Sequence, residues 1–286
     1  MRFRFIYHHK DEFRIAKMAE VLKVTVGGYY SWLKRLYKED DSQKIRIKEI
    51  VRKVFLESNC VYGSRKIAKV ISHSYGMIVN HKKVAAIMQK EKIISKSSRK
   101  YKATTNSRHS LPVADNILNR DFTSARPNMK MVSDITYIPT DEGWLYVAAV
   151  MDLCGRKIVV MSMNSTMTKE LTIEALRDAV NHVGNVKGCI LHSDRGSQYC
   201  SIDYQNFVHA NGFIISMSRK GNCWDNAPME CFWGKMKQEW LNDQHFKTRE
   251  EAKKAVFEYI CIFYNRIRVH DSNDYMTPEE YYSISA

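Results

Sequence analysis

The spacing of hydrophobic residues along the chain changes near Phe122. Before this point, apolar residues recur every three or four positions, a spacing typical of amphipathic helices. After it, short apolar runs rich in β-branched and aromatic residues alternate with helical stretches, which favours strands connected by helices. The pattern therefore predicts an all-α region followed by an α/β domain.

The first 40 residues form the first predicted segment. Apolar residues fall mostly on one stripe over 11–22 and again over 29–36, and Lys23-Val-Thr-Val-Gly-Gly separates the two stretches. Two short helices across such a turn predict a helix-turn-helix-like segment over residues 1–40. A plain helical hairpin without DNA contacts fits this segment equally well.

Residues 44–95 predict a second helical module that binds DNA. Its helices are expected over 45–57, 65–72 and 81–90. Ser64 and Asn80 are expected to cap the last two helices. The third helix begins with Lys82 and Lys83 and carries an apolar stripe. A recognition helix needs a buried face and exposed donors at its N-terminal end, so both lysines are candidate DNA contacts.

Residues 96–121 predict a basic linker between the helical region and the α/β domain. The stretch from Lys96 to His109 contains no acidic residue. A segment of this kind is suited to lie along DNA phosphates. The candidate contacts within it are Arg99, Lys100 and Lys102.

The domain over 122–286 is expected to hold a mixed five-stranded sheet with helices on both faces, followed by a helical tail. The strands are expected over 131–139, 144–153, 157–163, 189–193 and 213–217. The helices are expected over 168–182, 204–210, from Glu230 onward, and over 246–265. The first two strands form a hairpin across Asp141-Glu-Gly143.

The net charge of +14 is concentrated in the first part of the chain. Residues 1–112 hold 26 Lys and Arg against 9 Asp and Glu, whereas residues 113–286 hold 19 against 22. An imbalance on this scale favours a polyanionic partner over a merely solvated surface. Because no lipid-binding signal accompanies it, the charge predicts binding to double-stranded DNA and not to a membrane.

The remaining composition points to a cytoplasmic protein. The sequence has no stretch of 18 apolar residues and no signal-peptide pattern at its N-terminus. Its seven cysteines are scattered and have no zinc-ligand spacing. We therefore expect reduced, mostly buried thiols.

Three acidic residues could together form a metal site. Asp194 follows an apolar strand, Asp134 interrupts a β-rich run, and Glu230 opens a helix. Carboxylates on two strands and a helix can converge to hold a pair of Mg²⁺ ions for phosphoryl transfer. Taken singly, each acid also has an ordinary structural explanation: a turn acceptor, a polar group on an edge strand, or a charge that complements a helix dipole.

The order and the amino-acid sequences of several motifs resemble those of one known family. They are Tyr62-Gly-Ser-Arg-Lys-Ile, Ser133-Asp-Ile-Thr-Tyr, His192-Ser-Asp-Arg-Gly-Ser-Gln-Tyr, Asp225-Asn-Ala-Pro-Met-Glu230 and Tyr264-Asn-Arg-Ile-Arg-Val-His270. Together they resemble the OrfB-type bacterial insertion-sequence transposases, which have a retroviral-integrase-like DDE catalytic core. The resemblance extends from about residue 10 to 284. The family usually has Trp where this chain has Met131.

The resemblance implies a ribonuclease H-like core with Asp134, Asp194 and Glu230 as catalytic residues and ligands of two Mg²⁺ ions, for which Mn²⁺ is a possible substitute. The family's basic residue seven places after the glutamate corresponds to Lys237. Seven residues are nearly two helical turns, so Lys237 shares the face of Glu230 and could hold a DNA phosphate. An ordinary surface lysine is the alternative.

Other residues near these acids are weaker candidates. Asp152 ends the second predicted strand and could be a metal ligand, but a partner for Arg156 or a turn cap is the simpler interpretation. His192 could touch phosphate or orient Asp194, although a hydrogen-bonded structural histidine is simpler. The basic residues Arg195, Arg219 and Lys220 flank the site and are candidate contacts to the DNA backbone.

The expected function is that of a DNA transposase that binds element ends, nicks them at the 3′ end and transfers the strand to target DNA. The alternatives are an inactive or repurposed DNA-binding protein and a ribonuclease H-type nuclease. The resemblance further implies a homo-multimer on DNA, dependence on or fusion with an upstream OrfA-type protein, and a location at the bacterial nucleoid.

Overall fold

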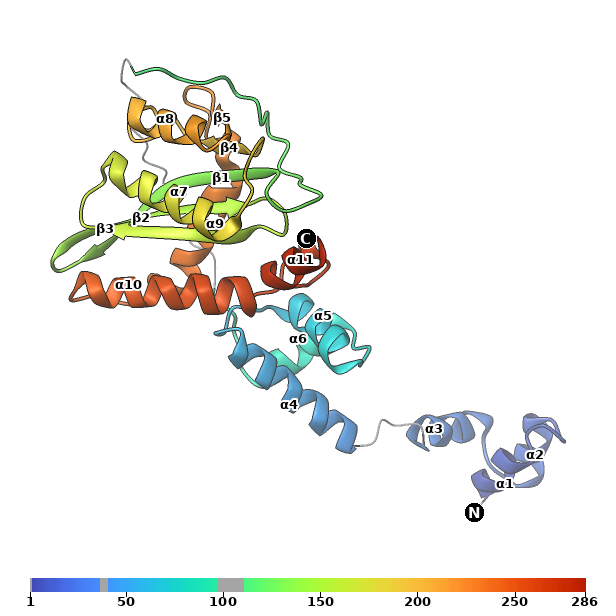
Figure 1. Ribbon diagram of the computed structural model, residues 1–286. Helices are drawn as coiled ribbons and strands as arrows, with labels where there is room; N and C mark the ends of the chain where they lie inside the picture. Colours follow the sequence, from blue (N-terminus) through green and yellow to red (C-terminus); the bar gives the residue numbers. More distant parts are fainter. Residues whose placement is uncertain (1, 37–40, 97–110) are drawn as a thin grey trace. The chain divides into compact units, whose positions relative to one another are not determined.

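The computed structural model describes residues 2–36, 41–96 and 111–286 (Figure 1). These form two compact units, Met1–Arg52 and Lys53–Ala286. The division falls inside one helix, α4 (Asp41–Glu57), and each unit is described by itself. Most of the predicted linker over 96–121 lies outside the described residues.

The first unit contains a small aromatic core. Its helices before α4 are α1 (Arg2–His8), α2 (Ile15–Val21) and α3 (Val26–Leu36). Ile6, Met18 and Tyr29 are buried together, one from each helix. The two helices predicted over the first 40 residues are present as α2 and α3, but α1 was not predicted. Its Phe3 ring packs 5.9 Å from the Trp32 ring, a contact between distant residues that periodicity within seven residues does not reveal.

Helix α3 begins earlier than predicted, within the supposed break. The Thr25 hydroxyl accepts a hydrogen bond from the Gly28 amide at 3.0 Å, which satisfies one of the open donors at the helix start. A Cβ on Gly28 would lie 2.8 Å from that same hydroxyl oxygen. Glycine here permits a tight helix start and does not end the helix.

The second unit begins with the end of α4 and a helical pair, α5 (Ser64–Tyr75) and α6 (His81–Lys90). Asn80 caps α6 as predicted, because its side chain accepts a hydrogen bond from the Lys82 amide at 2.9 Å. Ser64, in contrast, is the first residue of α5, and Gly63 holds the cap position. The apolar stripes of both helices are buried at Ile67, Ile71, Val84 and Met88.

The predicted five-stranded sheet is confirmed. Its strands are β1 (Lys130–Thr140), β2 (Gly143–Asp152), β3 (Lys157–Asn164), β4 (Ile190–Ser193) and β5 (Ile214–Met217). The order is β3-β2-β1-β4-β5. The first three strands are antiparallel, whereas β4 pairs parallel to both β1 and β5. The sheet is therefore mixed, and β4 pairs with β1 only from Lys130 to Val132.

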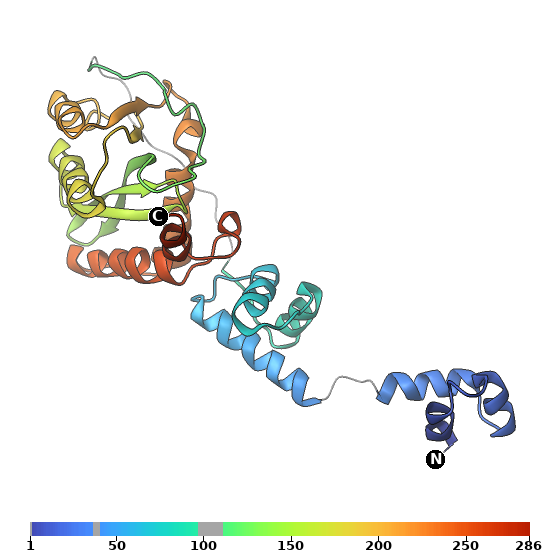
Figure 2. The ribbon, with the colours of Figure 1, turned by 45° about the vertical axis from the view of Figure 1, so that its right-hand side comes forward.

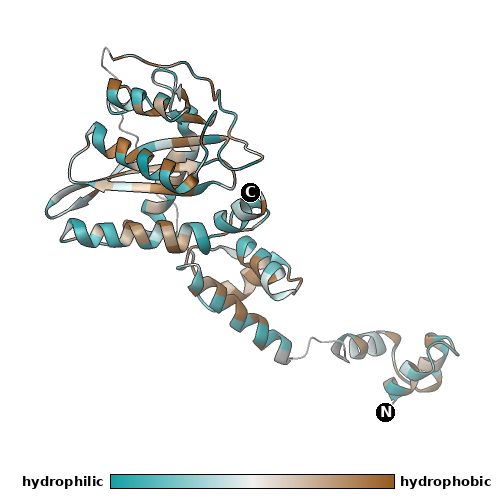
Figure 3. Ribbon diagram, viewed as in Figure 1, coloured by the Kyte–Doolittle hydropathy of each residue, from teal (hydrophilic) through white to brown (hydrophobic). Residues whose placement is uncertain are grey.

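Helices cover both faces of the sheet, as predicted (Figure 1). They are α7 (Lys169–Val183), α8 (Ile202–Ala210), α9 (Ala227–Met236), α10 (Arg249–Phe257) and, near the C-terminus, α11 (Pro278–Ile284). One core packs α7 and α8 against residues such as Met131, and the other packs α9 and α10 against residues such as Val132. Alternate strand residues thus serve opposite cores. Figure 3 shows hydrophilic and hydrophobic residues interleaved along these helices.

Two π-helical segments extend the helices α9 and α10. Lys237–Leu241 continues α9, and Glu258–Tyr264 continues α10. Wider π turns alter the usual backbone pairing. The Glu239 carbonyl accepts hydrogen bonds from the Lys96 ammonium at 3.0 Å and the Asn59 amide at 3.3 Å. These bonds join residues next to the helical pair to the extension of α9 within the second unit.

Within the described residues, no helix is long and apolar enough to cross a membrane.

Candidate active site

Asp134 lies in the middle of β1, on the face that packs against α9. It is half-buried, and the pKa of its carboxyl is raised well above its usual value. Burial is the largest cause, followed by the negative charges of Asp194 and Glu230. The Trp233 indole NH lowers this pKa, although it forms no hydrogen bond of standard geometry. Asp134 is therefore a carboxylate held close to two others.

Asp194 is the first residue after β4, at the carboxyl end of that strand. The Gly196 amide donates a hydrogen bond to its Oδ1 at 2.8 Å, and this turn fixes the carboxylate. A Cβ on Gly196 would lie 3.1 Å from Oδ1 of Asp194 and 3.1 Å from Oε1 of Gln198. The glycine leaves the room that the carboxylate needs.

Glu230 lies in the first turn of α9, after Pro228 has started the helix. The residue is exposed overall, but partial burial of its carboxyl raises its pKa, and the charge of Asp194 raises it further. The charge of Asp194 thus raises the pKa of both Asp134 and Glu230. The structure brings the three sequence-predicted acids into one electrostatic neighbourhood.

The donor chemistry of this neighbourhood suits a hard cation. Carboxylate oxygens are the ligands that Mg²⁺ prefers, and mutual repulsion among the three acids favours a cation between them. In the part of the chain that the structure describes, however, no three His, Cys, Asp or Glu side chains stand ready to hold a metal ion. Glu230 is the exposed member of the set.

Lys237 lies beside this acidic neighbourhood, where the π-helical turn begins. Its Nζ is 4.9 Å from the centroid of the Tyr137 ring, a cation–π contact. Burial lowers the pKa of Lys237 to about 8, and the negative charge of Asp134 opposes that shift. Lys237 therefore lies near Asp134, one of the candidate metal ligands.

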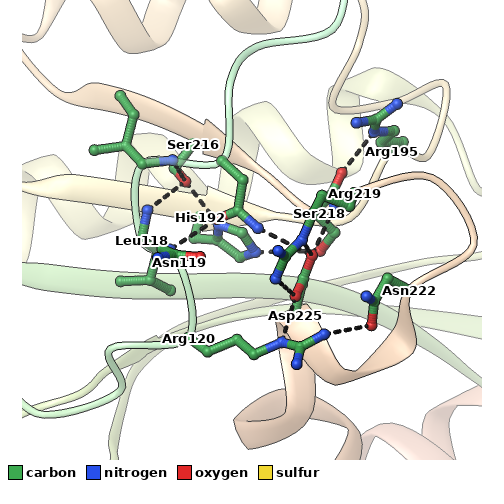
Figure 4. Close-up of polar contacts among 12 residues, drawn as sticks. Leu118, Asn119, Arg120, His192, Arg195, Ser216, Ser218, Arg219, Asn222 and Asp225 are labelled. Carbon is green, nitrogen blue, oxygen red and sulfur yellow. Dashed lines mark hydrogen bonds and ion pairs between the residues drawn. The ribbon is translucent and has the colours of Figure 1, made fainter.

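His192 is fully buried in β4 and does not reach the surface (Figure 4). Its Nδ1 is 2.8 Å from the Ser216 hydroxyl and its Nε2 is 3.1 Å from the Ser218 hydroxyl. Burial lowers the pKa of the imidazole to about 4, so it is neutral near pH 7. The suggested DNA contact does not fit this environment, and the structural interpretation of His192 does.

Arg219 is engaged by a buried carboxylate that sequence reasoning left without a role. Asp225 accepts hydrogen bonds from Nε and Nη2 of Arg219, at 2.8 and 2.7 Å. It also accepts from Arg120 Nε at 2.7 Å and from the Asn116 amide at 2.9 Å. These contacts fasten the segment before β1 to the loop before α9 (Figure 4). Sequence reasoning gave Asp225 no role of its own, because two of its partners, Arg120 and Asn116, are more than 100 residues away.

The other sequence candidates occupy varied positions. Arg195 is half-buried and donates to the Ser218 carbonyl, whereas Lys220 is exposed. Lys82 is exposed and Lys83 half-buried at the start of α6. The candidates Arg99, Lys100 and Lys102 lie outside the described residues.

Asp152 is a turn cap, which confirms the simpler interpretation of this residue. Its carboxylate accepts from the Asn128 amide at 2.7 Å and from the Cys154 amide at 2.8 Å. It is fully buried, and burial raises its pKa to about 6. These bonds occupy both carboxylate oxygens, which explains why a buried Asp is tolerated at the end of β2.

Comparison with known proteins gives three family models that match parts of the chain. Family models described as "HTH-like domain" and "Integrase core domain" match residues 41–101 and 124–223, and a second integrase core model matches 230–285. The HTLV-2 integrase catalytic core in complex with magnesium is a structural neighbour, with a TM-score of 0.41 and 18% identity over 55% of this chain and 97% of that one.

Relatives match almost the whole chain. An uncharacterized 31 kDa protein of insertion element IS600 from Shigella sonnei is 41% identical over 94% of this chain and 100% of its own length. Transposase InsF for insertion sequence IS3A from Escherichia coli (strain K12) is 38% identical over 98% of both chains. With this similarity over nearly the full length, the protein belongs to the insertion-sequence transposase family that includes InsF, with an HTH-like domain ahead of an integrase core.

Proposed function

We propose that this transposase nicks the 3′ ends of its element and joins them to target DNA at a site formed by Asp134, Asp194 and Glu230. The observation that carries the proposal is the proximity of the three acids, because the charges of Asp194 and Glu230 both raise the pKa of Asp134. Without a bound cation, three acids that converge from two adjacent strands and a helix repel one another, which destabilises the fold. A function that needs concentrated negative charge explains the arrangement.

The three carboxylates would hold two Mg²⁺ ions, or Mn²⁺ in their place. When bound, such ions activate an oxygen nucleophile and stabilise the leaving 3′-oxygen. Asp194 is fixed by the Gly196 amide and Asp134 by its strand, so these two residues supply a rigid base for the site. Glu230 is the exposed ligand that completes it.

Lys237 positions the substrate in this proposal. Its ammonium lies near Asp134, where it can hold a phosphate next to the scissile bond. Lys82 and Lys83 on α6 bind DNA in this proposal, as do Arg99, Lys100 and Lys102. The exposed Lys220 and the half-buried Arg195 contact the backbone near the site.

The working protein is a homo-multimer on two element ends in the bacterial cytoplasm, with an OrfA-type protein as partner or fusion. DNA binding by the helical module follows from the HTH-like match and from the basic composition of residues 1–112. The multimer and the OrfA-type partner are inferred from family resemblance.

A cleavage assay tests the catalytic assignment. A labelled duplex with the element's terminal repeat is incubated with the full-length protein and Mg²⁺, and in parallel with Ca²⁺. We expect Glu230→Gln to abolish nicking and strand transfer but to leave DNA binding nearly intact, because a carboxamide lacks the charge that a hard cation needs. Normal activity of this variant contradicts the assignment.

A second arm separates positioning from chemistry. Lys237→Ala should weaken engagement of the end about ten- to a hundred-fold, since it removes a charged hydrogen bond. Saturating DNA should restore much of its activity. Lys235→Ala is the matched control, because its charge acts on Lys66 and His270 and not on the acidic site. If Lys237→Ala is inactive even at saturating DNA, the positioning role is wrong.

A further inference from the structure

A cavity of about 420 Å³ lies beside the acidic site, and Lys237 is part of its wall. The rest of the wall comes from the end of β1, the start of β2 and the residues that follow the first π-helical segment. Because Lys237 also lies close enough to Asp134 for their charges to interact, one side chain belongs to both places. The cavity is thus adjacent to the proposed chemistry.

Sheet topology explains why there is space here. β4 pairs with β1 only over Lys130–Val132, so the part of β1 that carries Asp134 and Tyr137 has no β4 partner. Pro139 lies on this part of the strand and also lines the cavity. A proline without an N–H to donate is suited to such an unpaired edge. The cavity thus lies beside the part of β1 that β4 leaves unpaired.

Aromatic rings give the cavity a stacking surface. The rings of Tyr137 and Trp144 are nearly perpendicular, at 82° with centroids 4.9 Å apart, so each restrains the other. The Lys237 ammonium already lies over the Tyr137 ring. Trp144, in contrast, is 47% exposed although it is large and apolar. An exposed indole held by a neighbouring ring is a ready platform for a planar group.

The polar groups around this platform suit a nucleotide. Lys237 offers a cation for a phosphate, and the exposed Asn242 offers an amide for the edge of a base. Asp141 also lines the cavity, and its carboxylate lies 3.1 Å from Nε2 of His245, within hydrogen-bond distance. An aromatic surface with an adjacent cation is how proteins bind unpaired nucleotides.

We propose that this cavity captures one unpaired nucleobase of the DNA next to the reacting phosphodiester, stacked on Trp144, with its phosphate on Lys237. This inference rests on the proposed function and adds a base-binding site to it. Enzymes that act within a duplex commonly extrude a nucleotide into a pocket. Here the captured base fixes the register of the strand relative to Asp134.

Binding of the full-length protein to labelled element-end duplexes in Ca²⁺ tests the inference without chemistry. A series of duplexes carries a single abasic residue at each position near the cleaved phosphate, on either strand. We expect Trp144→Ala to weaken binding of the intact end on the order of 10-fold. At one position, the abasic duplex should bind as weakly to the parent protein, and Trp144→Ala should then cause no further loss.

Matched variants guard against a general effect. Trp144→Phe retains an aromatic face and should bind nearly as the parent, whereas Trp144→Leu retains bulk alone and should behave as Trp144→Ala. Phe257→Ala removes another half-exposed aromatic ring, on α10, and should change nothing. The inference is overturned if no abasic position cancels the Trp144 effect, or if Trp144→Leu binds as tightly as the parent.

The same series on target DNA without an element end identifies the source of the base. Cancellation on the element end assigns the base to the element, and cancellation only on target duplexes assigns it to the target; either supports capture. Nicking by the parent protein in Mg²⁺ is measured separately. Normal nicking without any cancellation rejects the base site and leaves the proposed function standing, whereas absence of nicking counts against the function itself.

Discussion

The Arg268 guanidinium and the Glu239 carboxylate form a buried, bidentate ion pair, with N–O distances of 2.7 and 2.8 Å. Both side chains are only 5% exposed. Glu239 also accepts from the Tyr259 hydroxyl at 2.9 Å. The pair joins the segment after the second π-helical turn to the helix that carries Glu230.

Arg268→Met should destabilise the protein by about 3–5 kcal/mol, because it leaves the Glu239 carboxylate buried without its cation. The double variant Glu239→Leu/Arg268→Met should lose less, since no lone charge stays inside. Urea unfolding followed by circular dichroism measures both. A single variant as stable as the parent would show that the pair contributes little.

His192 should make stability depend on pH. Its folded pKa is about 4, below the usual 6.5, so the unfolded chain binds more protons between these values. Stability is fully present above about pH 6.5 and falls toward pH 4, by up to about 3 kcal/mol from this group. His192→Gln should flatten that part of the profile. The comparison with the parent is needed because His270, whose pKa is lowered to about 2, acts in the same direction. Parallel profiles would contradict the assignment.

Gly196→Ala should impair activity more than stability. The added Cβ would lie 3.1 Å from Oδ1 of Asp194, closer than ordinary contact, so the carboxylate must shift. Catalytic geometry tolerates such shifts poorly, and a loss on the order of 100-fold is expected. Gly234→Ala is a control, because a Cβ there meets nothing within 4 Å. Nicking rates and melting temperatures of both variants decide the matter.

Lys82→Ala should weaken DNA binding and also make it less sensitive to salt. Lys82 is exposed in the first turn of α6, where a phosphate contact is expected. Loss of one such contact should reduce the slope of log K against log[salt] by about 0.9. Lys90→Ala, at the other end of the same helix, should leave the slope unchanged. Equal slopes for the parent and Lys82→Ala would exclude a phosphate contact.

Features set by local chemistry were predictable from sequence. The Asn80 cap, the strand and helix order of the core and the mixed sheet all follow from periodicity and from residues that act on near neighbours. The helix predicted from Phe246 begins only at Arg249, because Thr248 and Glu251 form a capping box. Boundaries depend on such individual hydrogen bonds more than on hydrophobic pattern.

Features set by distant contacts were not predictable in this way. The π-helical turn at Lys237 leaves no mark in the apolar spacing, and α1 is stabilised by aromatic packing against α3. The hydrogen-bond partners of the buried His192 are hydroxyl groups of β5 and the loop after it, which its own strand does not reveal. The candidate acids were found because each ends or interrupts an element, but only the fold sets their charges against one another.

The segment before β1 has consequences for the order in which the chain can fold. Residues 111–121 run past the sheet as an extended trace (Figure 2). The Ile117 and Leu118 amides both bond to the Ser216 hydroxyl, at 2.9 and 3.0 Å, across separations of 99 and 98 residues. During synthesis this segment emerges about a hundred residues before its anchor and must wait for β5. A chain that ends before Ser216 therefore leaves residues 111–121 without these two hydrogen bonds, and the segment can be anchored only after β5 has been synthesised.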